Sequence, residues 1–350
     1  MRRDKMETVD VDEFLRDRGV SDGEIADAEA DGLLAVLVLD KLVFAGSAHF
    51  DEAKLVGEVG VEPDVARQLW RAMGFPTVPP GEVAFYDDDL EALAGAVLPD
   101  PNAPVEPMVR QTRVMSAAMA RIAERITDDV EDTFADLRAS GHSDREIAAY
   151  AIEVFDTDSL EGLLWYLFRR QFRASVWRRL ARPEANGGTP ATVVGFVDLV
   201  RFAAITEQVA DDELERLIDR FEEVAHDAVT EGGGRIIKMI GDAVMYVADD
   251  PVHAVAVALD LVDAYSDDEL VPPARAGLAY GTALGREGDY YGPIVNLASR
   301  IVDIARPSKV VISDDLHAAI SEATGFSFRR LPPKRLKGIG HPHLWSVARR

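Results

Sequence analysis

Residues 235–247 read Arg235-Ile-Ile-Lys-Met-Ile-Gly-Asp-Ala-Val-Met-Tyr-Val247, which is two short apolar segments on either side of a glycine and an aspartate. Such a pattern predicts a β-hairpin whose turn is Ile240-Gly-Asp242. The flanking segments predict the remaining elements: strands over Thr192–Val197, Ala274–Tyr280 and Val310–Ser313, and helices over Asp211–Val229, His253–Tyr265 and Ile294–Ala305. Strand, helix, hairpin, helix, strand is the ferredoxin-like order, so we expect an α+β domain here.

The N-terminal half has a different pattern, with apolar residues at helical spacing over much of residues 10–182. Asp10 or Asp12 is placed to cap a first helix. Ser21 with Glu24, and Ser143 with Glu146, have the spacing of capping boxes. Helical spacing is clearest in Asp64–Met73, Val109–Leu137 and Ser143–Phe155, and the proline-rich stretches Pro76–Pro80 and Pro99–Pro107 predict loops.

Composition and a Gly/Pro-rich stretch divide the chain. Residues 183–190 contain Asn-Gly-Gly-Thr-Pro and predict a linker between an all-α domain over 1–182 and an α+β domain over 191–350. Within the first domain, residues 160–182 are rich in aromatic residues, and from Trp165 onward they contain six arginines and no acid. We expect a connector helix that packs its aromatic face on a core; a helix lying on a membrane surface is the alternative.

The overall charge restricts the classes of partner. The chain of 350 residues has a formal net charge of −24, which argues against nucleic acid as a partner. It contains no cysteine, so a metal would have to bind oxygen or imidazole ligands. No apolar signal segment follows the first residues, and the longest apolar stretch is too short to span a bilayer, so we expect a cytoplasmic protein.

Two carboxylates stand at the ends of apolar strands. Asp198 follows Val193-Val-Gly-Phe-Val197, and Asp242 lies at the predicted hairpin turn. Paired carboxylates on rigid strand ends suit hard cations such as Mg²⁺ or Mn²⁺, and a pair of such ions is used in phosphoryl transfer. Either aspartate alone could equally be a turn former or a helix cap.

Further polar residues stand near these strands. Lys238 lies in the first hairpin strand, where simple alternation places it on the face opposite Ile237 and Met239. Asn296 and Arg300 are four residues apart, so a helix would present both on one face, where they could bind a ribose and a phosphate. Each residue taken singly could equally be a solvated surface residue.

Three segments together resemble the signature segments of class III nucleotide cyclases, in that family's order and spacing. They are Phe196-Val-Asp-Leu-Val200, Gly234-Arg-Ile-Ile-Lys-Met-Ile-Gly-Asp242 and Gly288-Asp-Tyr-Tyr-Gly-Pro-Ile-Val-Asn-Leu-Ala-Ser-Arg300. The resemblance covers about residues 190–350. It implies a ferredoxin-like catalytic domain that converts ATP to 3′,5′-cyclic AMP and pyrophosphate.

The resemblance also implies a role for individual residues. Asp198 and Asp242 match the residues that hold two Mg²⁺ or Mn²⁺ ions. Lys238 and Asp289 match the pair that reads the purine, and this pair of residue types is typical of adenylyl rather than guanylyl cyclases. Further matches are Asn296 to the ribose-orienting residue, Arg300 to the arginine that stabilises the transition state, and Lys337 in Leu336-Lys-Gly338 to a lysine that contacts the terminal phosphates.

Assembly follows from the same resemblance. Catalytic domains of this family meet head to tail, so we expect a homodimer in which one protomer gives Asp198 and Asp242 and its partner gives the other residues. Phe196 and Arg201 are additional candidates for substrate binding. The loop after Asp198 departs from the family pattern, since Arg201 stands where glycine is usual and Ala203 where threonine is usual.

The helical domain resembles, by general layout and the segment Ala30-Asp-Gly-Leu-Leu34, the regulatory domain of actinobacterial cyclases that respond to pH and fatty acids. The resemblance implies a possible fatty acid or lipid ligand in this domain and a role for residues 160–182 in setting the distance between catalytic domains. His49 and His142 are its only histidines, and His226 and His253 lie on predicted catalytic-domain helices. The alternatives are a catalytically silent nucleotide sensor, a lipid-binding module and a guanylyl cyclase.

Overall fold

The computed structural model describes residues 9–44, 46–96, 104–180 and 191–350. The chain divides into two compact units, Met1–Ala181 and Arg182–Arg350. The predicted linker 183–190 lies outside the described residues.

The described part of the first unit is helical, as the sequence predicts. Its helices are α1 (Val11–Arg16), α2 (Asp22–Ala30), α3 (Leu34–Val43), α4 (Glu52–Val59), α5 (Pro63–Ala72), α6 (Asp87–Ala96), α7 (Val105–Ala139), α8 (Asp144–Val154) and α9 (Thr157–Leu180). Asp10 caps α1 by accepting a hydrogen bond from Glu13 N. Both predicted capping boxes are confirmed, Ser21 with Glu24 at α2 and Ser143 with Glu146 at α8.

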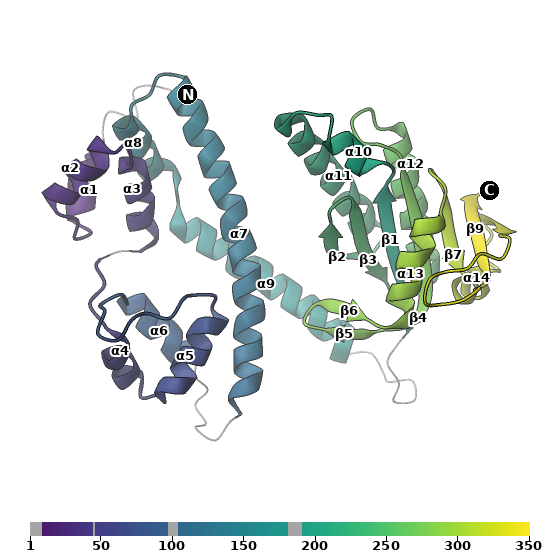
Figure 1. Ribbon diagram of the computed structural model, residues 1–350, viewed down its shortest axis with the longest axis horizontal. Coiled ribbons are helices and arrows are strands. Elements are labelled where there is room, and N and C mark those ends of the chain that lie inside the picture. Colours follow the sequence, from purple (N-terminus) through teal and green to yellow (C-terminus); the bar gives the residue numbers. More distant parts are fainter. Residues whose placement is uncertain (1–8, 45, 97–103, 181–190) are drawn as a thin grey trace. The chain divides into compact units, whose positions relative to one another are not determined.

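Two small cores share the long helix α7, which spans 35 residues and therefore about 52 Å. One core gathers α1, α2, α3 and α8 around the C-terminal part of α7, and the other gathers α4, α5 and α6 near its N-terminal part (Figure 1). The predicted loop Pro99–Pro107 is wrong at its C-terminal end, because α7 begins at Val105. Proline is tolerated in the first turn of a helix, where its missing N–H has no partner within the helix, so Pro107 does not prevent this start.

Helix α9 differs from the interpretation that the sequence favoured. None of its side chains is buried, and Trp165, Phe168, Phe172 and Trp177 each expose more than half of their surface. Trp165 stacks on Phe168, and Phe168 on Phe172, along the outside of the helix. Docking of the aromatic face on a core of its own unit is therefore wrong for the described residues.

The second unit is built on a seven-stranded sheet with the order β2-β3-β1-β4-β7-β9-β8. The strands of the unit are β1 (Ala191–Leu199), β2 (Arg235–Ile240), β3 (Ala243–Ala248), β4 (Ala274–Thr282), β5 (Leu284–Arg286), β6 (Asp289–Tyr291), β7 (Val310–Ser313), β8 (Phe326–Arg330) and β9 (Leu344–Arg349). Its helices are α10 (Phe202–Thr206), α11 (Asp211–Glu231), α12 (Pro251–Asp267), α13 (Pro293–Ile304) and α14 (Asp314–Ile320). The neighbouring strands β2, β3, β1 and β4 form the ferredoxin-like core that the sequence predicts.

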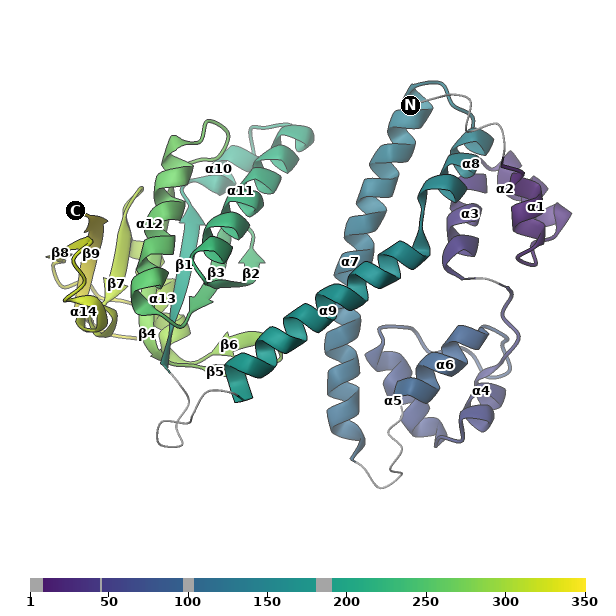
Figure 2. The ribbon, with the colours of Figure 1, turned by 180° about the vertical axis from the view of Figure 1, so that it is seen from behind.

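Helices cover both faces of this sheet. On one face lie α11, α12 and α14 (Figure 2). They bury the main core, which includes Tyr246, Tyr265 and Phe221. On the other face α13 packs against β1 and β4 (Figure 1). Contact with α13 is close at Gly277 of β4, where an added Cβ would lie 2.2 Å from the backbone nitrogen of Val302.

Strand β2 contains a β-bulge that the sequence did not indicate. Its pairing with β3 shifts register between Ile236 and Lys238, so Ile237 is an extra residue. Met239 packs in the main core, but Ile237 packs in the core under α13. The predicted alternation is therefore confirmed for Met239 and wrong for Ile237, because a bulge interrupts the two-residue period of a strand.

Among the described helices, none is long and apolar enough to cross a membrane.

Candidate active site

The two predicted metal ligands lie at adjacent strand ends. Asp198 pairs across the sheet with Ala243, the residue after Asp242, and the N–H of Leu199 donates to the carbonyl oxygen of Asp242 at 3.0 Å. Antiparallel pairing of β1 with β3 therefore brings both aspartates to one edge of the sheet, as the sequence predicts.

Asp198 also has a cationic partner. In the register of β1 with β4 it lies opposite Arg275, whose Nε and Nη2 donate to Asp198 Oδ2 at 2.8 and 2.6 Å. Burial raises the pKa of Asp198; the hydrogen bonds and charge of Arg275 oppose this rise, and the charges of Asp242 and Asp303 add to it. The site is thus a desolvated acidic edge with one guanidinium in it.

Arg275 is a residue of this site that the sequence motifs did not indicate. The sequence contains one signal for it. Arg275 is the second residue of a predicted strand, Ala274–Tyr280, whose other residues are small or apolar, and a charged side chain there needs solvent or a charged partner. The strand order, which places β4 beside β1, was needed to connect Arg275 with Asp198.

Lys238 and Asp289 come together although they are 51 residues apart. Lys238 Nζ donates to Asp289 Oδ2 at 2.5 Å, which joins β2 to β6. The Asp289 side chain is 24% exposed. Burial would raise its pKa, but hydrogen bonds from Lys238, from the N–H of Tyr290 and from the Tyr291 side chain outweigh burial and lower it. Asp289 is therefore held as an acceptor carboxylate beside a donor ammonium.

Helix α13 presents the other pair on one face, as four-residue spacing predicts. Asn296 and Arg300 are both exposed, while Ala298, Ile301 and Val302 of the same helix are buried. Arg300 Nη1 donates to Asp303 Oδ2 at 3.2 Å one turn further along. The outward face of α13 thus carries an amide and a guanidinium that are open to a ligand or a partner.

The remaining candidates have less direct support. Phe196 is 7% exposed and packs in the core under α13, so its burial favours a packing role and its contact with substrate stays a prediction. Lys337 is exposed at the start of a tight loop closed by pairing of Leu336 with Gly340. Arg201 is exposed with φ 64°, and it precedes α10 without a side-chain cap. Glycine adopts a left-handed conformation at no steric cost, whereas for an arginine this conformation is unfavourable.

Two carboxylates suit hard divalent cations, and a cation would stabilise the charged form of Asp198, whose pKa is raised by burial and by the charges of Asp242 and Asp303. No group of three or more acidic or histidine side chains gathers as a metal site in the described ranges. Backbone carbonyls, water and substrate phosphates would therefore have to complete any coordination of Mg²⁺ or Mn²⁺.

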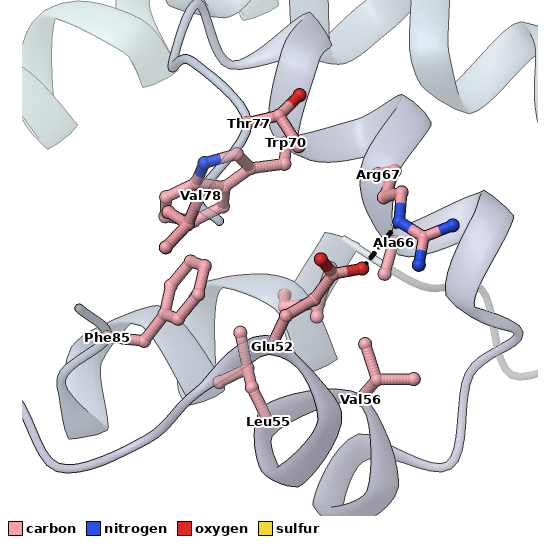
Figure 3. Close-up of a pocket in the computed structure, with 10 residues that line it drawn as sticks. Glu52, Leu55, Val56, Ala66, Arg67, Trp70, Thr77, Val78 and Phe85 are labelled. Atoms are coloured by element: carbon pink, nitrogen blue, oxygen red, sulfur yellow. Dashed lines mark hydrogen bonds and ion pairs between the residues drawn. The ribbon is translucent and has the colours of Figure 1, made fainter. Parts of the chain in front are cut away.

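The first unit contains a small apolar cavity between α4, α5 and α6 (Figure 3). Trp70, Phe85 and Leu55 form much of its wall, and Arg67 Nε donates to Glu52 Oε1 at 2.6 Å on one side. The space open to the centre of a water molecule is about 20 Å³, enough for one or two waters.

Comparisons with known proteins identify the family of the chain. Residues 187–348 match the family model described as the adenylate and guanylate cyclase catalytic domain. Relatives cover most of the chain: an adenylate cyclase of Glutamicibacter nicotianae is 33% identical over 79% of this chain and 73% of its own length. The chain belongs to the class III adenylate cyclases.

Two further relatives match most of this chain, including part of its helical unit. One from Streptomyces coelicolor is 33% identical over 81% of this chain and 74% of its own length. The pH-sensitive adenylate cyclase MT1302 of Mycobacterium tuberculosis is 30% identical over 96% of this chain and 87% of its own length. Among solved structures, the adenylyl cyclase CyaB from P. aeruginosa matches 46% of this chain and 94% of its own, with 21% identity and a TM-score of 0.41.

Proposed function

We propose that this cyclase prefers ATP and forms 3′,5′-cyclic AMP and pyrophosphate by a single in-line displacement. The ribose 3′-oxygen attacks the α-phosphorus and loses its proton to solvent. The bond from the α-phosphorus to the bridging oxygen breaks, and pyrophosphate leaves with that electron pair. The observation that carries the preference for ATP is the contact between Lys238 and Asp289. A donor ammonium beside an acceptor carboxylate complements the ring nitrogen and the exocyclic amine of adenine.

Asp198 and Asp242 would hold Mg²⁺ or Mn²⁺ at the acidic edge of the sheet. Two bound ions would activate the 3′-hydroxyl and neutralise the triphosphate. Arg275 would turn from Asp198 toward a phosphate once the added cations neutralise this carboxylate. Arg300 would stabilise charge at the α-phosphate, Asn296 would orient the ribose, and Lys337 would contact the terminal phosphates.

A homodimer is the proposed active form. In support, β2 is an edge strand of the sheet, and its last residue Ile240 is 48% exposed. Leu284 of β5 and Tyr291 of β6 are 64% and 51% exposed. Unpaired edges and exposed apolar residues are features that a second copy would cover. Asp198 and Asp242 would then face Lys238, Asp289, Asn296 and Arg300 of the second copy.

Regulation by the helical unit is proposed from two of its features. His49 Nε2 lies 3.2 Å from Asp87, and His142 Nδ1 lies 3.9 Å from Glu146, so both histidines face a carboxylate. The cavity near Trp70 is apolar and would receive an acyl chain if its helices separate. Helix α9, with no buried side chain, would be the connector that changes its packing between states.

Competition between substrates tests this proposal. Purified full-length protein with equal ATP and GTP and Mn²⁺ should yield cyclic AMP in at least about tenfold excess over cyclic GMP, with one pyrophosphate per cyclic nucleotide. Equal products would contradict the proposed preference. A protein that binds a non-reactive ATP analogue but yields no product would be a silent sensor. The observation that supports this alternative is Arg201, which has a left-handed conformation and stands where glycine is usual.

A further inference from the structure

The hairpin of β5 and β6 lies outside the seven-stranded sheet and forms a two-stranded sheet of its own. Two side-chain contacts join it to β2. One is the contact of Lys238 with Asp289, and the other is a hydrogen bond from Arg235 Nη2 to Tyr290 Oη at 3.0 Å. The guanidinium carbon of Arg235 also lies 5.8 Å from the centre of the Tyr290 ring.

The bulge in β2 makes this double contact possible. Arg235 and Lys238 are three residues apart, so in a regular strand they would point to opposite faces. With Ile237 as an extra residue, Arg235 lies opposite Val247 and Lys238 opposite Met245. Val247 and Met245 are two apart on β3 and both pack in the core under α13, so Arg235 and Lys238 share that face.

Tyr290 connects the two contacts. Its ring packs against the core under α13, its hydroxyl accepts from Arg235, and its N–H donates to Asp289 Oδ1 at 2.7 Å. Asp289 is therefore fixed through both oxygens, by Lys238 on Oδ2 and by the backbone of Tyr290 on Oδ1. A displacement of Tyr290 would rotate the carboxylate away from Lys238.

We propose that Arg235 and Tyr290 are positioning residues for purine selection, which act through Asp289 and do not touch the base. This rests on the proposed function of Lys238 and Asp289. Base selection requires the acceptor carboxylate at a fixed distance from the donor ammonium, and a small error in that geometry weakens a hydrogen bond steeply. The Arg235–Tyr290 contact sets the position of the hairpin that carries the carboxylate.

Binding measurements test this on the full chain without the need for turnover. Affinities for a non-reactive ATP analogue and its GTP counterpart would be measured for the wild type, Tyr290→Phe and Arg235→Gln. Loss of one hydrogen bond should lower the ratio of ATP to GTP affinity about three- to tenfold in each variant. Arg235→Lys, which keeps a donor, should restore part of the ratio. Arg216→Gln on α11, where the exposed Arg216 side chain pairs with Asp212, should keep the wild-type ratio.

A double-mutant cycle separates positioning from general loosening. If Arg235 acts through Asp289, Arg235→Gln should change the affinity ratio little once Asp289 is asparagine. Additive effects, or a wild-type ratio in Tyr290→Phe and Arg235→Gln, would overturn the inference. If the wild type binds ATP selectively but forms no product, only the proposed catalysis is contradicted. If the wild type binds the ATP and GTP analogues equally well, both the proposed purine preference and the positioning role of Arg235 and Tyr290 are overturned.

Discussion

Arg275 donates two hydrogen bonds to a single oxygen of Asp198, from Nε at 2.8 Å and from Nη2 at 2.6 Å. The two residues lie directly opposite each other on β4 and β1. Arg275 thus supplies positive charge at the edge of the sheet where Asp198 and Asp242 lie together. A divalent cation and this guanidinium would compete for the same carboxylate.

Replacing Arg275 should therefore lower the free energy of unfolding without metal and increase the stabilisation that a bound metal gives. Arg275→Met leaves a largely buried Asp198 without its cation, and should lower the free energy of unfolding by about 1–3 kcal/mol in chelator. Mn²⁺ should then stabilise the variant more than the wild type, because no guanidinium competes for the carboxylate. Urea unfolding with and without Mn²⁺ measures both effects.

The control for this prediction is Arg216→Met. Arg216 forms an exposed pair with Asp212 at 3.8 Å, which should contribute less than about 1 kcal/mol. Equal Mn²⁺ stabilisation of the wild type and Arg275→Met would contradict the predicted competition.

Gly277 should not tolerate a side chain. The Cβ of alanine would lie 2.2 Å from Val302 N and 2.8 Å from Ile301 C, both backbone atoms of α13. Gly277→Ala should force α13 away from β4 and cost about 2–4 kcal/mol in unfolding free energy. Gly325→Ala is the matched control, because its Cβ would meet nothing within 4 Å. Similar thermal unfolding of both variants would show that the close packing of α13 is not as described.

Asp268 should make stability fall in acid. Burial would raise its pKa, but hydrogen bonds from Arg220 and from the N–H groups of Leu270 and Val271 outweigh burial, and the pKa lies below its ordinary value. A lowered carboxyl pKa gives stability that is present above the unfolded-state pKa of about 4 and is lost as pH falls through the folded-state value.

Asp268→Asn should thus cost about 1 kcal/mol at pH 7, since Arg220 is partly exposed, and the difference from wild type should shrink below about pH 4. Urea unfolding at pH 7 and at several values below pH 4 measures it. A difference that stays constant over this range would contradict the predicted role of the carboxylate charge.

Much of the fold could be predicted from the sequence because its signals were local. Ser21 with Glu24 and Ser143 with Glu146 satisfy backbone groups within one turn, so their spacing alone locates two helix starts. Alternation and apolar runs located β1, β2 and β3 in the same way. The position of Pro107 misled because proline is compatible with the first turn of a helix as well as with a loop.

The features that were missed depend on contacts between distant residues. Nothing near Ile237 indicates a bulge, which places Arg235 and Lys238 on one face, where both contact the hairpin that carries Asp289 and Tyr290. Arg275 can be connected with Asp198 only through the strand order, which places β4 beside β1. The exposure of α9 could not be predicted either. An aromatic sequence suits a buried helix, and it gives no sign that the other helices of the first unit leave α9 uncovered.

Asp242→Asn in the full-length protein tests the central claim most directly. With ATP and Mn²⁺, the wild type should form cyclic AMP and pyrophosphate in equal amounts, and Asp242→Asn should be at least about 100-fold slower, because a metal carboxylate supplies several kcal/mol of transition-state stabilisation. Asp227→Asn, an exposed position on α11, should match the wild type, and all three proteins should unfold at similar temperatures. Undiminished turnover in folded Asp242→Asn would contradict the proposed metal site, and no product from the wild type would contradict the proposed reaction.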